Sequence, residues 1–134
     1  MTGVQTCALP ISLQPKQQYQ NMLADADVSL ITQQSGTGQF FFPSKLLSNL
    51  SAGNAVMTVA DPDSELALAQ IAGSFGFNVP PGQPDKLASL LDSLADRRSH
   101  LPALGENGRS YVSRFAFSKV LADFETQLKR LEKT

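Results

Sequence analysis

The sequence predicts an α/β protein with an incomplete Rossmann-like parallel sheet, followed by C-terminal helices. Short apolar segments of about five residues, rich in β-branched side chains, alternate with longer helical patterns, which is typical of parallel sheets with right-handed helical crossovers. Three such strands can be counted, at residues 28–32, 55–59 and 75–79. Because a doubly wound domain usually has about five or six strands, we expect the second half of one.

The elements before the second strand are placed by apolar spacing and by proline and glycine. A helix is expected at residues 17–26, where apolar residues recur at helical spacing: Tyr19, Met22, Leu23 and Ala26. The first strand follows and is expected to be buried. Residues 33–39 form a polar loop in which two glycines allow a sharp bend. Pro43 and Ser44 then open a helix that stops at Gly53.

Helices dominate the rest of the chain. A short helix at residues 65–72 ends at Gly73, and Pro84 starts a longer one after the third strand. Two more helices are predicted at residues 101–114 and 118–133. Five phenylalanines are expected in the core: Phe75, Phe77, Phe115, Phe117 and Phe124. The alternative for the last helix is that it crosses to another domain.

Composition places the chain among ordinary globular proteins. Its 134 residues are 42% hydrophobic and 17% charged, with a formal net charge of -1, which suits one domain. The small net charge argues against nucleic acid as a partner, since phosphate binding needs a surplus of Lys and Arg. One cysteine and one histidine exclude an internal disulfide and argue against a His/Cys zinc site. No apolar run reaches the roughly 20 residues of a membrane-spanning helix, so a cytoplasmic location is expected.

The first residues of the chain do not fit the rest. Residues 1–12 lack the basic start of a signal peptide, and their apolar stretch is broken by Gln5, Thr6 and Pro10. They resemble the translation of a short-read sequencing adapter in which GTG is read as the start codon. We therefore expect a disordered artefact at residues 1–12 and a partial domain at residues 13–134. The alternative is a natural disordered N-terminus.

A ligand site is expected where the first strand leads into the helix opened by Pro43. In an open parallel sheet, ligands bind beyond the carboxyl ends of the strands, near helix N-termini. Free amides and the helix dipole favour an anion such as a diphosphate there. Ser44 and Lys45 offer a hydroxyl and a charge to phosphate oxygens, and Gly36 and Gly38 allow the backbone to approach closely. The alternative is that Ser44 caps the helix and Lys45 is a solvated surface residue.

Six short segments occur in an order that is known from one enzyme family. In chain order they are residues 23–30, Pro43-Ser44-Lys45-Leu46-Leu47, residues 50–56 with Ala52-Gly53, Ser64-Glu65-Leu66, residues 78–82, and Arg109-Ser110-Tyr111-Val112 with Phe117. Together they resemble the family-4 glycosyltransferases of the GT-B fold, specifically the bacterial colanic-acid or exopolysaccharide type. The resemblance covers residues 19–131, and the order and spacing of the segments carry it.

The resemblance implies transfer of a sugar from a nucleotide diphosphate donor to a saccharide or lipid-linked acceptor, with no cofactor and no metal. The donor would lie between two Rossmann-like domains, and the acceptor would bind through the missing N-terminal domain. We expect the truncated chain to be inactive as a transferase, and no catalytic residue can be assigned. The resemblance leaves room for peripheral association of the full-length enzyme with the inner membrane. The implied donor-binding residues are Gly36, Thr37, Gly38, Ser44, Lys45, Ser48, Gly53 and Glu65.

Two positions depart from the family pattern. The family typically has two glutamates, separated by seven residues, where this chain has Phe40 and Ser48. A phenyl ring cannot orient a hexose hydroxyl, and a serine offers one hydroxyl in place of a bidentate carboxylate. The colanic-acid type often lacks these glutamates, so their absence indicates this subgroup of the family. It also leaves the recognition of the ribose unexplained.

Several alternatives stay open at the level of the sequence. Glu65 matches a family glutamate near the nucleotide, or it stabilises a helix N-terminus through the dipole. His100 is expected to be an exposed loop residue. Two aspartate pairs are expected in turns or caps rather than around calcium: Asp25/Asp27 and Asp61/Asp63. A non-enzymatic α/β interaction or regulatory module is the second hypothesis. The missing glutamates support it, and a fold alone does not define a function. A third alternative is another GT-B user of sugar nucleotides, such as an epimerase.

Overall fold

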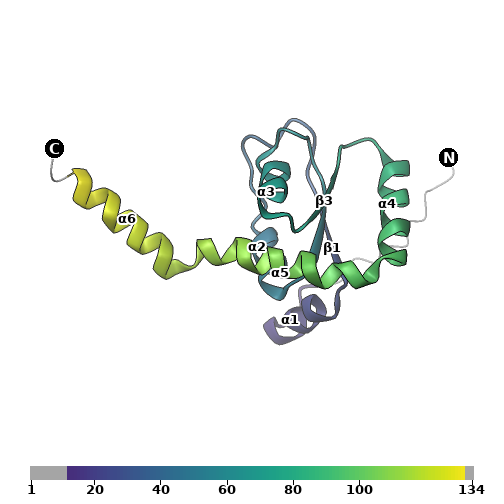
Figure 1. Cartoon of the computed structure of the whole chain (residues 1–134), viewed down its shortest axis with the longest axis horizontal. Coiled ribbons are helices and arrows are strands. Elements are labelled where there is room, and N and C mark those ends of the chain that lie inside the picture. Colours follow the sequence, from purple (N-terminus) through teal and green to yellow (C-terminus); the bar gives the residue numbers. More distant parts are fainter. Residues whose placement is uncertain (1–11, 132–134) are drawn as a thin grey trace.

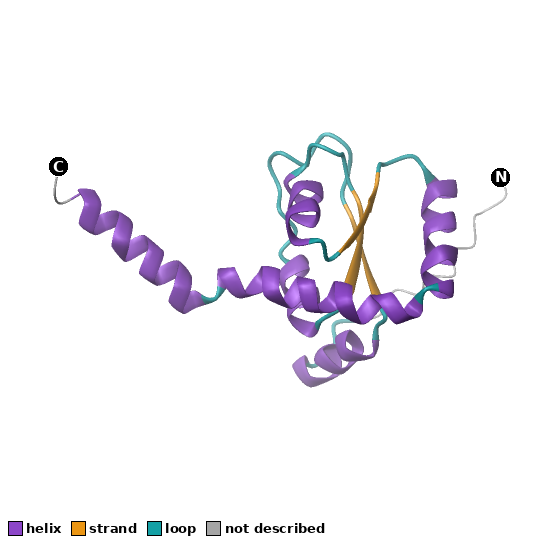
Figure 2. Cartoon of the chain, in the orientation of Figure 1, coloured by secondary structure: helices purple, strands orange, loops and turns teal. Residues whose placement is uncertain are grey.

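The computed structural model describes residues 12–131 and shows an α/β fold built on a three-stranded sheet (Figure 1, Figure 2). Strands β1 (Val28–Thr32), β2 (Ala55–Val59) and β3 (Gly76–Val79) lie in the order β1-β2-β3 and pair in parallel. The predicted fold class is confirmed, and so are the three predicted strands. The artefact expected at residues 1–12 lies outside the described residues, except for Ser12.

Helices connect and flank the strands close to the bounds that the sequence predicts. They are α1 (Lys16–Asp25), α2 (Lys45–Ala52), α3 (Glu65–Gly73), α4 (Pro84–Asp96), α5 (Leu101–Val112) and α6 (Phe117–Leu131). Short 3-10 turns, Arg98–His100 and Ser113–Phe115, precede and follow α5. As predicted, α2 stops at Gly53, which has a left-handed φ of 88°. Helix α3 includes Gly73 and stops one residue later than predicted, at Ser74 with a φ of 48°.

The sheet is packed between helices on its two faces (Figure 1). Helices α2, α3 and α5 cover one face, where the core is made of buried apolar side chains: Ile31, Leu46, Leu50, Val56, Ala60, Leu66, Ala69, Phe75 and Tyr111. On the other face, Leu94 of α4 and Leu101 of α5 pack against Ala55 and Met57 of β2. Because successive residues of a strand point to opposite faces, the central strand β2 contributes to both cores.

Helix α5 crosses the C-terminal end of α2 at close range. A Cβ atom at Gly105 would collide with the carbonyl group of Gly53, so glycine is needed for this approach of the two backbones. The guanidinium group of Arg109 donates a hydrogen bond of 2.8 Å to the carbonyl oxygen of Ala52. That oxygen belongs to the last turn of α2, whose carbonyls have no partner within the helix. The two contacts hold the C-terminal end of α2 in place.

The prediction of five core phenylalanines is right for Phe75 and wrong for the other four. Phe75 is fully buried, whereas Phe77 and Phe115 are 39% and 44% exposed and Phe117 and Phe124 are 81% and 60% exposed. Phe77 lies on β3, an edge strand of the sheet, and Phe115 follows the end of α5. Phe117 and Phe124 lie on α6, which extends away from the domain in Figure 1 and buries none of its residues.

The first strand is less buried than predicted, and the helix before it is exposed. Helix α1 buries none of its residues, and Tyr19 and Met22 are exposed on its apolar stripe. Strand β1 pairs with β2 on one edge, and its central residue Leu30 is half-exposed. Apolar spacing identified the element type at both places, but burial depends on which neighbours cover the apolar side.

Gly105→Ala is expected to destabilise the protein, although alanine favours a helix over glycine by about 1 kcal/mol. The added methyl group would collide with the backbone at Gly53, and overpacking of this kind costs about 1–3 kcal/mol. Gly108→Ala is the matched control in the same helix, because its methyl group would lie 2.8 Å from the flexible Leu50 Cδ2 atom. Urea unfolding should give a lower free energy of unfolding for Gly105→Ala than for Gly108→Ala. Equal values would contradict the close contact between α2 and α5.

Candidate functional site

A cavity lies at the carboxyl end of β1, where the chain leads into α2. Its volume is about 360 Å³. The lining residues come from the end of β1, the following loop and the start of α2: Thr32, Gln33, Gln34, Thr37, Phe41, Pro43, Ser44 and Lys45. They include three of the predicted donor-binding residues, namely Thr37, Ser44 and Lys45. The cavity therefore lies where a ligand is expected in an open parallel sheet.

The N-terminus of α2 lies at this cavity and has free backbone donors. Helical hydrogen bonding begins with the amide of Leu46, which donates to the Pro43 carbonyl at 3.0 Å, and that of Leu47, which donates to the Ser44 carbonyl at 3.2 Å. The amides of Ser44 and Lys45 come before them and donate to no group within residues 12–131. Free amides at the positive end of a helix dipole form a site for an anion.

The side chains of Ser44 and Lys45 are also open to a ligand. The Ser44 hydroxyl makes no capping hydrogen bond, so the structure does not support the alternative that it caps α2. Lys45 is exposed and forms no ion pair with any carboxylate of the described part of the chain. A hydroxyl and an ammonium group both suit phosphate oxygens.

The loop of residues 33–42, called the β1–α2 loop below, forms one wall of the cavity and has a defined shape. The amides of Thr37 and Phe40 close two successive turns, with hydrogen bonds of 3.2 and 3.1 Å to carbonyls within the loop. Gly36 has a φ of 79°, a left-handed conformation that favours glycine. Gly38 is buried against the start of α3. Neither glycine lines the cavity, so both act on the shape of the loop.

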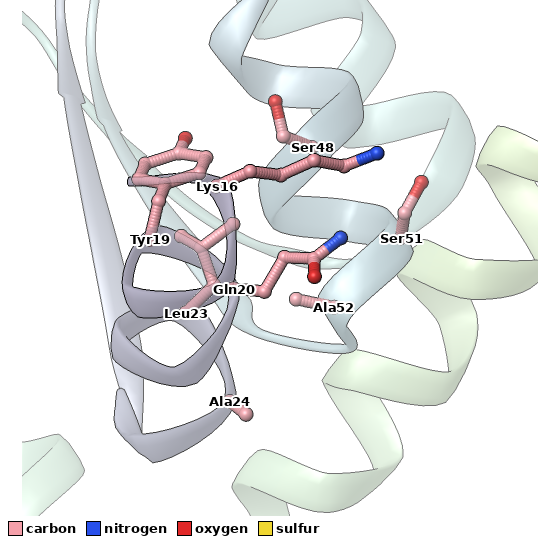
Figure 3. A pocket seen from close by; sticks show the side chains of 8 residues that line it. All are labelled: Lys16, Tyr19, Gln20, Leu23, Ala24, Ser48, Ser51 and Ala52. Atoms are coloured by element: carbon pink, nitrogen blue, oxygen red, sulfur yellow. The ribbon is translucent and has the colours of Figure 1, made fainter. Parts of the chain in front are cut away.

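The other predicted donor-binding residues lie away from this cavity. Ser48 lines a separate groove of about 430 Å³ between α1 and α2, and Figure 3 shows it on α2 beside the side chain of Lys16. Gly53 lies at the opposite end of α2. Glu65 lies in the first turn of α3 and lines a depression of about 510 Å³ together with Arg114. Their roles in donor binding remain predictions from the family resemblance.

Two residues that the sequence did not assign to the site support the β1–α2 loop. Gln33 is buried, and its Nε2 atom donates to the Phe41 carbonyl at 2.6 Å. Asp61 accepts hydrogen bonds from the Ser35 hydroxyl at 2.8 Å and from the Gly36 amide at 2.7 Å. Both Gln33 and Asp61 follow the carboxyl end of a strand. That position is the sequence signal that could have identified them.

The remaining candidates for chemistry take structural or surface positions. His100 is exposed in the 3-10 turn before α5, and Asp27 forms an ion pair with Arg98. Within residues 12–131, no group of three or more His, Cys, Asp and Glu side chains is placed to hold a metal ion. None of the helices described has both the length and the apolar character needed to cross a membrane.

The fold and the site define an α/β protein in which an open helix N-terminus borders a cavity at the edge of a parallel sheet. Over 90 residues, the chain is 30% identical to "Probable glycosyltransferase WbjE" of Pseudomonas aeruginosa. The match covers 67% of this chain and 22% of that protein, so the chain spans about a fifth of the length of the curated relative it matches. No family model matches the chain, and no solved structure matches it significantly. The similarity supports the general class of glycosyltransferases and leaves the finer family open.

Ser64→Ala is expected to lower the free energy of unfolding by about 1 kcal/mol, because it removes the cap of α3. The Ser64 hydroxyl accepts a hydrogen bond of 3.2 Å from the amide of Ala67. Ser44→Ala is the matched control at the start of α2. With no capping bond to lose, it should change the free energy by less than about 0.5 kcal/mol. Urea unfolding measures both values, and an equal loss at Ser44 would restore the capping role for that residue.

Proposed function

We propose that this chain belongs to the nucleotide-sugar-binding domain of a GT-B glycosyltransferase of the family-4, colanic-acid type. In this proposal the N-terminus of α2 binds the diphosphate of the donor. The observation that carries it is the pair of free amides at Ser44 and Lys45, which border a cavity of about 360 Å³ next to the Lys45 ammonium group. The family itself is inferred from the six sequence segments.

The chemistry of the cavity suits a diphosphate. Two amides, the Ser44 hydroxyl and the Lys45 ammonium group can all donate to phosphate oxygens, and hydrogen bonds that involve charged groups are the strong ones. The helix dipole adds the equivalent of about half a positive charge at this end. The Gln34 side-chain amide offers a further donor, whereas the Thr37 hydroxyl donates to the Gln34 carbonyl at 2.6 Å. None of the lining residues is acidic. No carboxylate of the cavity wall therefore repels the ligand.

The same donors would assist sugar transfer. When the bond between the sugar and the diphosphate breaks, negative charge develops on the leaving diphosphate. Donors that are already fixed in place stabilise such charge without reorganising during the reaction. Here two of the donors are backbone amides at the start of α2, whose other end is held by α5 through Gly105 and Arg109. Ser44 and Lys45 are thus proposed to bind the leaving group, and no general base is assigned.

The match to a probable glycosyltransferase supports the class of enzyme. From the family resemblance we further propose a nucleotide diphosphate sugar as donor and a saccharide or lipid-linked acceptor in exopolysaccharide synthesis. The acceptor would be held by another domain of the whole enzyme. A cytoplasmic location, with peripheral contact to the inner membrane, fits this assignment.

A second candidate is a module that binds a nucleotide diphosphate or a partner without catalysing transfer. Two positions favour it. Phe40, which stands where the family has a glutamate near the sugar, is 87% exposed and does not line the cavity. Ser48, at the second glutamate position, faces the groove between α1 and α2. Transferase activity of the whole protein, with a sugar nucleotide as donor, distinguishes the enzyme from the module.

Lys45→Ala is expected to weaken the binding of UDP by about 1.5–3 kcal/mol, because a charge-assisted hydrogen bond is lost. The dissociation constant should rise roughly 10- to 150-fold. Lys119→Ala is the matched control, because it removes the same charge from α6, away from the cavity. NMR titration of the 134-residue chain and of its two variants with UDP measures the three dissociation constants, and GDP is titrated for comparison.

An unchanged dissociation constant in Lys45→Ala would return Lys45 to the role of a solvated surface residue. A loss of equal size in Lys119→Ala would show that the effect comes from net charge and not from the cavity. If neither UDP nor GDP shifts any resonance of residues 32–45 in the wild-type chain, the proposed diphosphate site is wrong.

A further inference from the structure

Asp61 follows the end of β2, yet its carboxylate binds the β1–α2 loop, which follows a different strand. The Ser35 hydroxyl donates to its Oδ1 atom at 2.8 Å, and the Gly36 amide donates to its Oδ2 atom at 2.7 Å. Neither of the ion pairs in the described part of the chain involves Asp61. Both of its carboxylate oxygens are therefore engaged with neutral donors of the loop.

These two hydrogen bonds hold the tip of the β1–α2 loop, Ser35 and Gly36, against the turn after β2. Other contacts hold the base of the loop. Near the base, the Gln33 side chain bonds the Phe41 carbonyl at 2.6 Å. Further along, the Gly38 carbonyl accepts a hydrogen bond of 3.4 Å from the start of α3. The tip itself is exposed, and Gly36 could adopt many other backbone conformations. Asp61 thus restrains the part of the loop with the greatest freedom.

A local turn role does not account for the Asp61 side chain. Aspartates in turns commonly hydrogen-bond to backbone groups nearby in sequence. Here the Asp61 carbonyl closes the turn into α3 by accepting from the Ser64 amide at 3.0 Å, while the carboxylate points to residues 25 and 26 positions away. Asp63, in the same turn, is exposed and its side chain has no hydrogen bond or ion pair among the described residues. The two aspartates therefore differ in role.

We propose that Asp61 is a positioning residue, which holds Ser35 and Gly36 so that the β1–α2 loop keeps the cavity in the shape that receives the donor diphosphate. This inference rests on the proposed function of the cavity. Asp61 does not line the cavity, which keeps its negative charge from direct contact with phosphate. By ordering the loop in advance, it lowers the entropy that ligand binding must otherwise overcome.

Two substitutions distinguish the effect of the Asp61 charge from the effect of its hydrogen bonds. Asp61→Ala and Asp61→Asn both remove one negative charge, which by itself would favour an anionic ligand equally in both. Alanine loses both bonds to the loop. Asparagine can keep both, because its Oδ1 atom can accept from the Gly36 amide and its Nδ2 atom can donate to the Ser35 hydroxyl. Asp63→Ala removes the same charge from the same turn without touching the loop.

The test combines UDP titration with amide hydrogen exchange on the 134-residue chain. Asp61→Ala is expected to raise the dissociation constant of UDP roughly 10-fold, the scale of ordering a few loop groups. Asp61→Asn should stay within about 3-fold of wild type, and Asp63→Ala should bind UDP at least as tightly as wild type. Exchange of the Gly36 amide should accelerate at least about 10-fold in Asp61→Ala, while amides of β2 keep their protection.

Faster exchange of β2 amides in Asp61→Ala would mean that this variant is destabilised as a whole. The same two measurements on Ser35→Ala would then test the positioning role. It removes one of the two bonds and should give a smaller rise in the dissociation constant, about 3-fold, together with faster exchange at Gly36. Wild-type affinity and wild-type exchange in Ser35→Ala would then overturn the inference.

The inference and the proposed function fail in different ways. If wild type binds UDP and Asp61→Ala binds it equally well, Asp61 does not position the cavity, whatever the exchange rates show. Equal weakening in Asp61→Ala and Asp61→Asn would show that the effect does not follow the two hydrogen bonds, which asparagine can keep, and would also overturn a positioning role. If wild type binds neither UDP nor GDP, the proposed function falls, and the inference falls with it.

Discussion

The parallel pairing of β1 with β2 is the constraint on which the candidate site depends. The register runs from Val28 opposite Ala55 to Thr32 opposite Val59, so both strands end at the same edge of the sheet. At that edge β1 continues into the β1–α2 loop and β2 continues into the turn that contains Asp61. Hydrogen bonds of 2.7 and 2.8 Å between the two segments are possible for that reason. An antiparallel pair would place the two strand ends at opposite edges and separate the loop from its support.

Helix α2 connects the core of the domain to the candidate site. Its buried side, which includes Leu46 and Leu50, packs into the larger core, and its C-terminal end lies under α5. Its N-terminal end is left with free amides at the cavity. Several segments that carry the family resemblance have structural roles: Gly53 allows the contact with α5, Arg109 binds the last turn of α2, and Tyr111 packs in the core. A rigid support of this kind is what a site of fixed donors needs.

Local patterns predicted the elements well, and they predicted burial less well. Apolar spacing, prolines and glycines identified the three strands and the helices close to their observed bounds, because these signals act over a few residues. Phe117 and Phe124 were expected in the core, whereas both are exposed on α6, and so are the other apolar residues on the same stripe as Phe124, namely Val120, Leu121, Leu128 and Leu131. An apolar stripe shows which side of a helix can pack against a neighbouring element. Whether a partner lies within reach depends on contacts far apart in the sequence, and α6 has none that covers this stripe among the described residues.

The sequence by itself determined the α/β class, the order of the elements and the helix stop at Gly53, and it predicted the candidate site at Ser44 and Lys45. These follow from residue propensities, from apolar periodicity and from the rule that ligands bind beyond the carboxyl ends of the strands in an open parallel sheet. Only the tertiary structure decided that the Ser44 hydroxyl leaves α2 uncapped, that Ser48 faces α1, and that Asp61 holds the β1–α2 loop. The physical reason is that a hydrogen bond between residues 25 positions apart is set by strand register and packing, which no local pattern encodes.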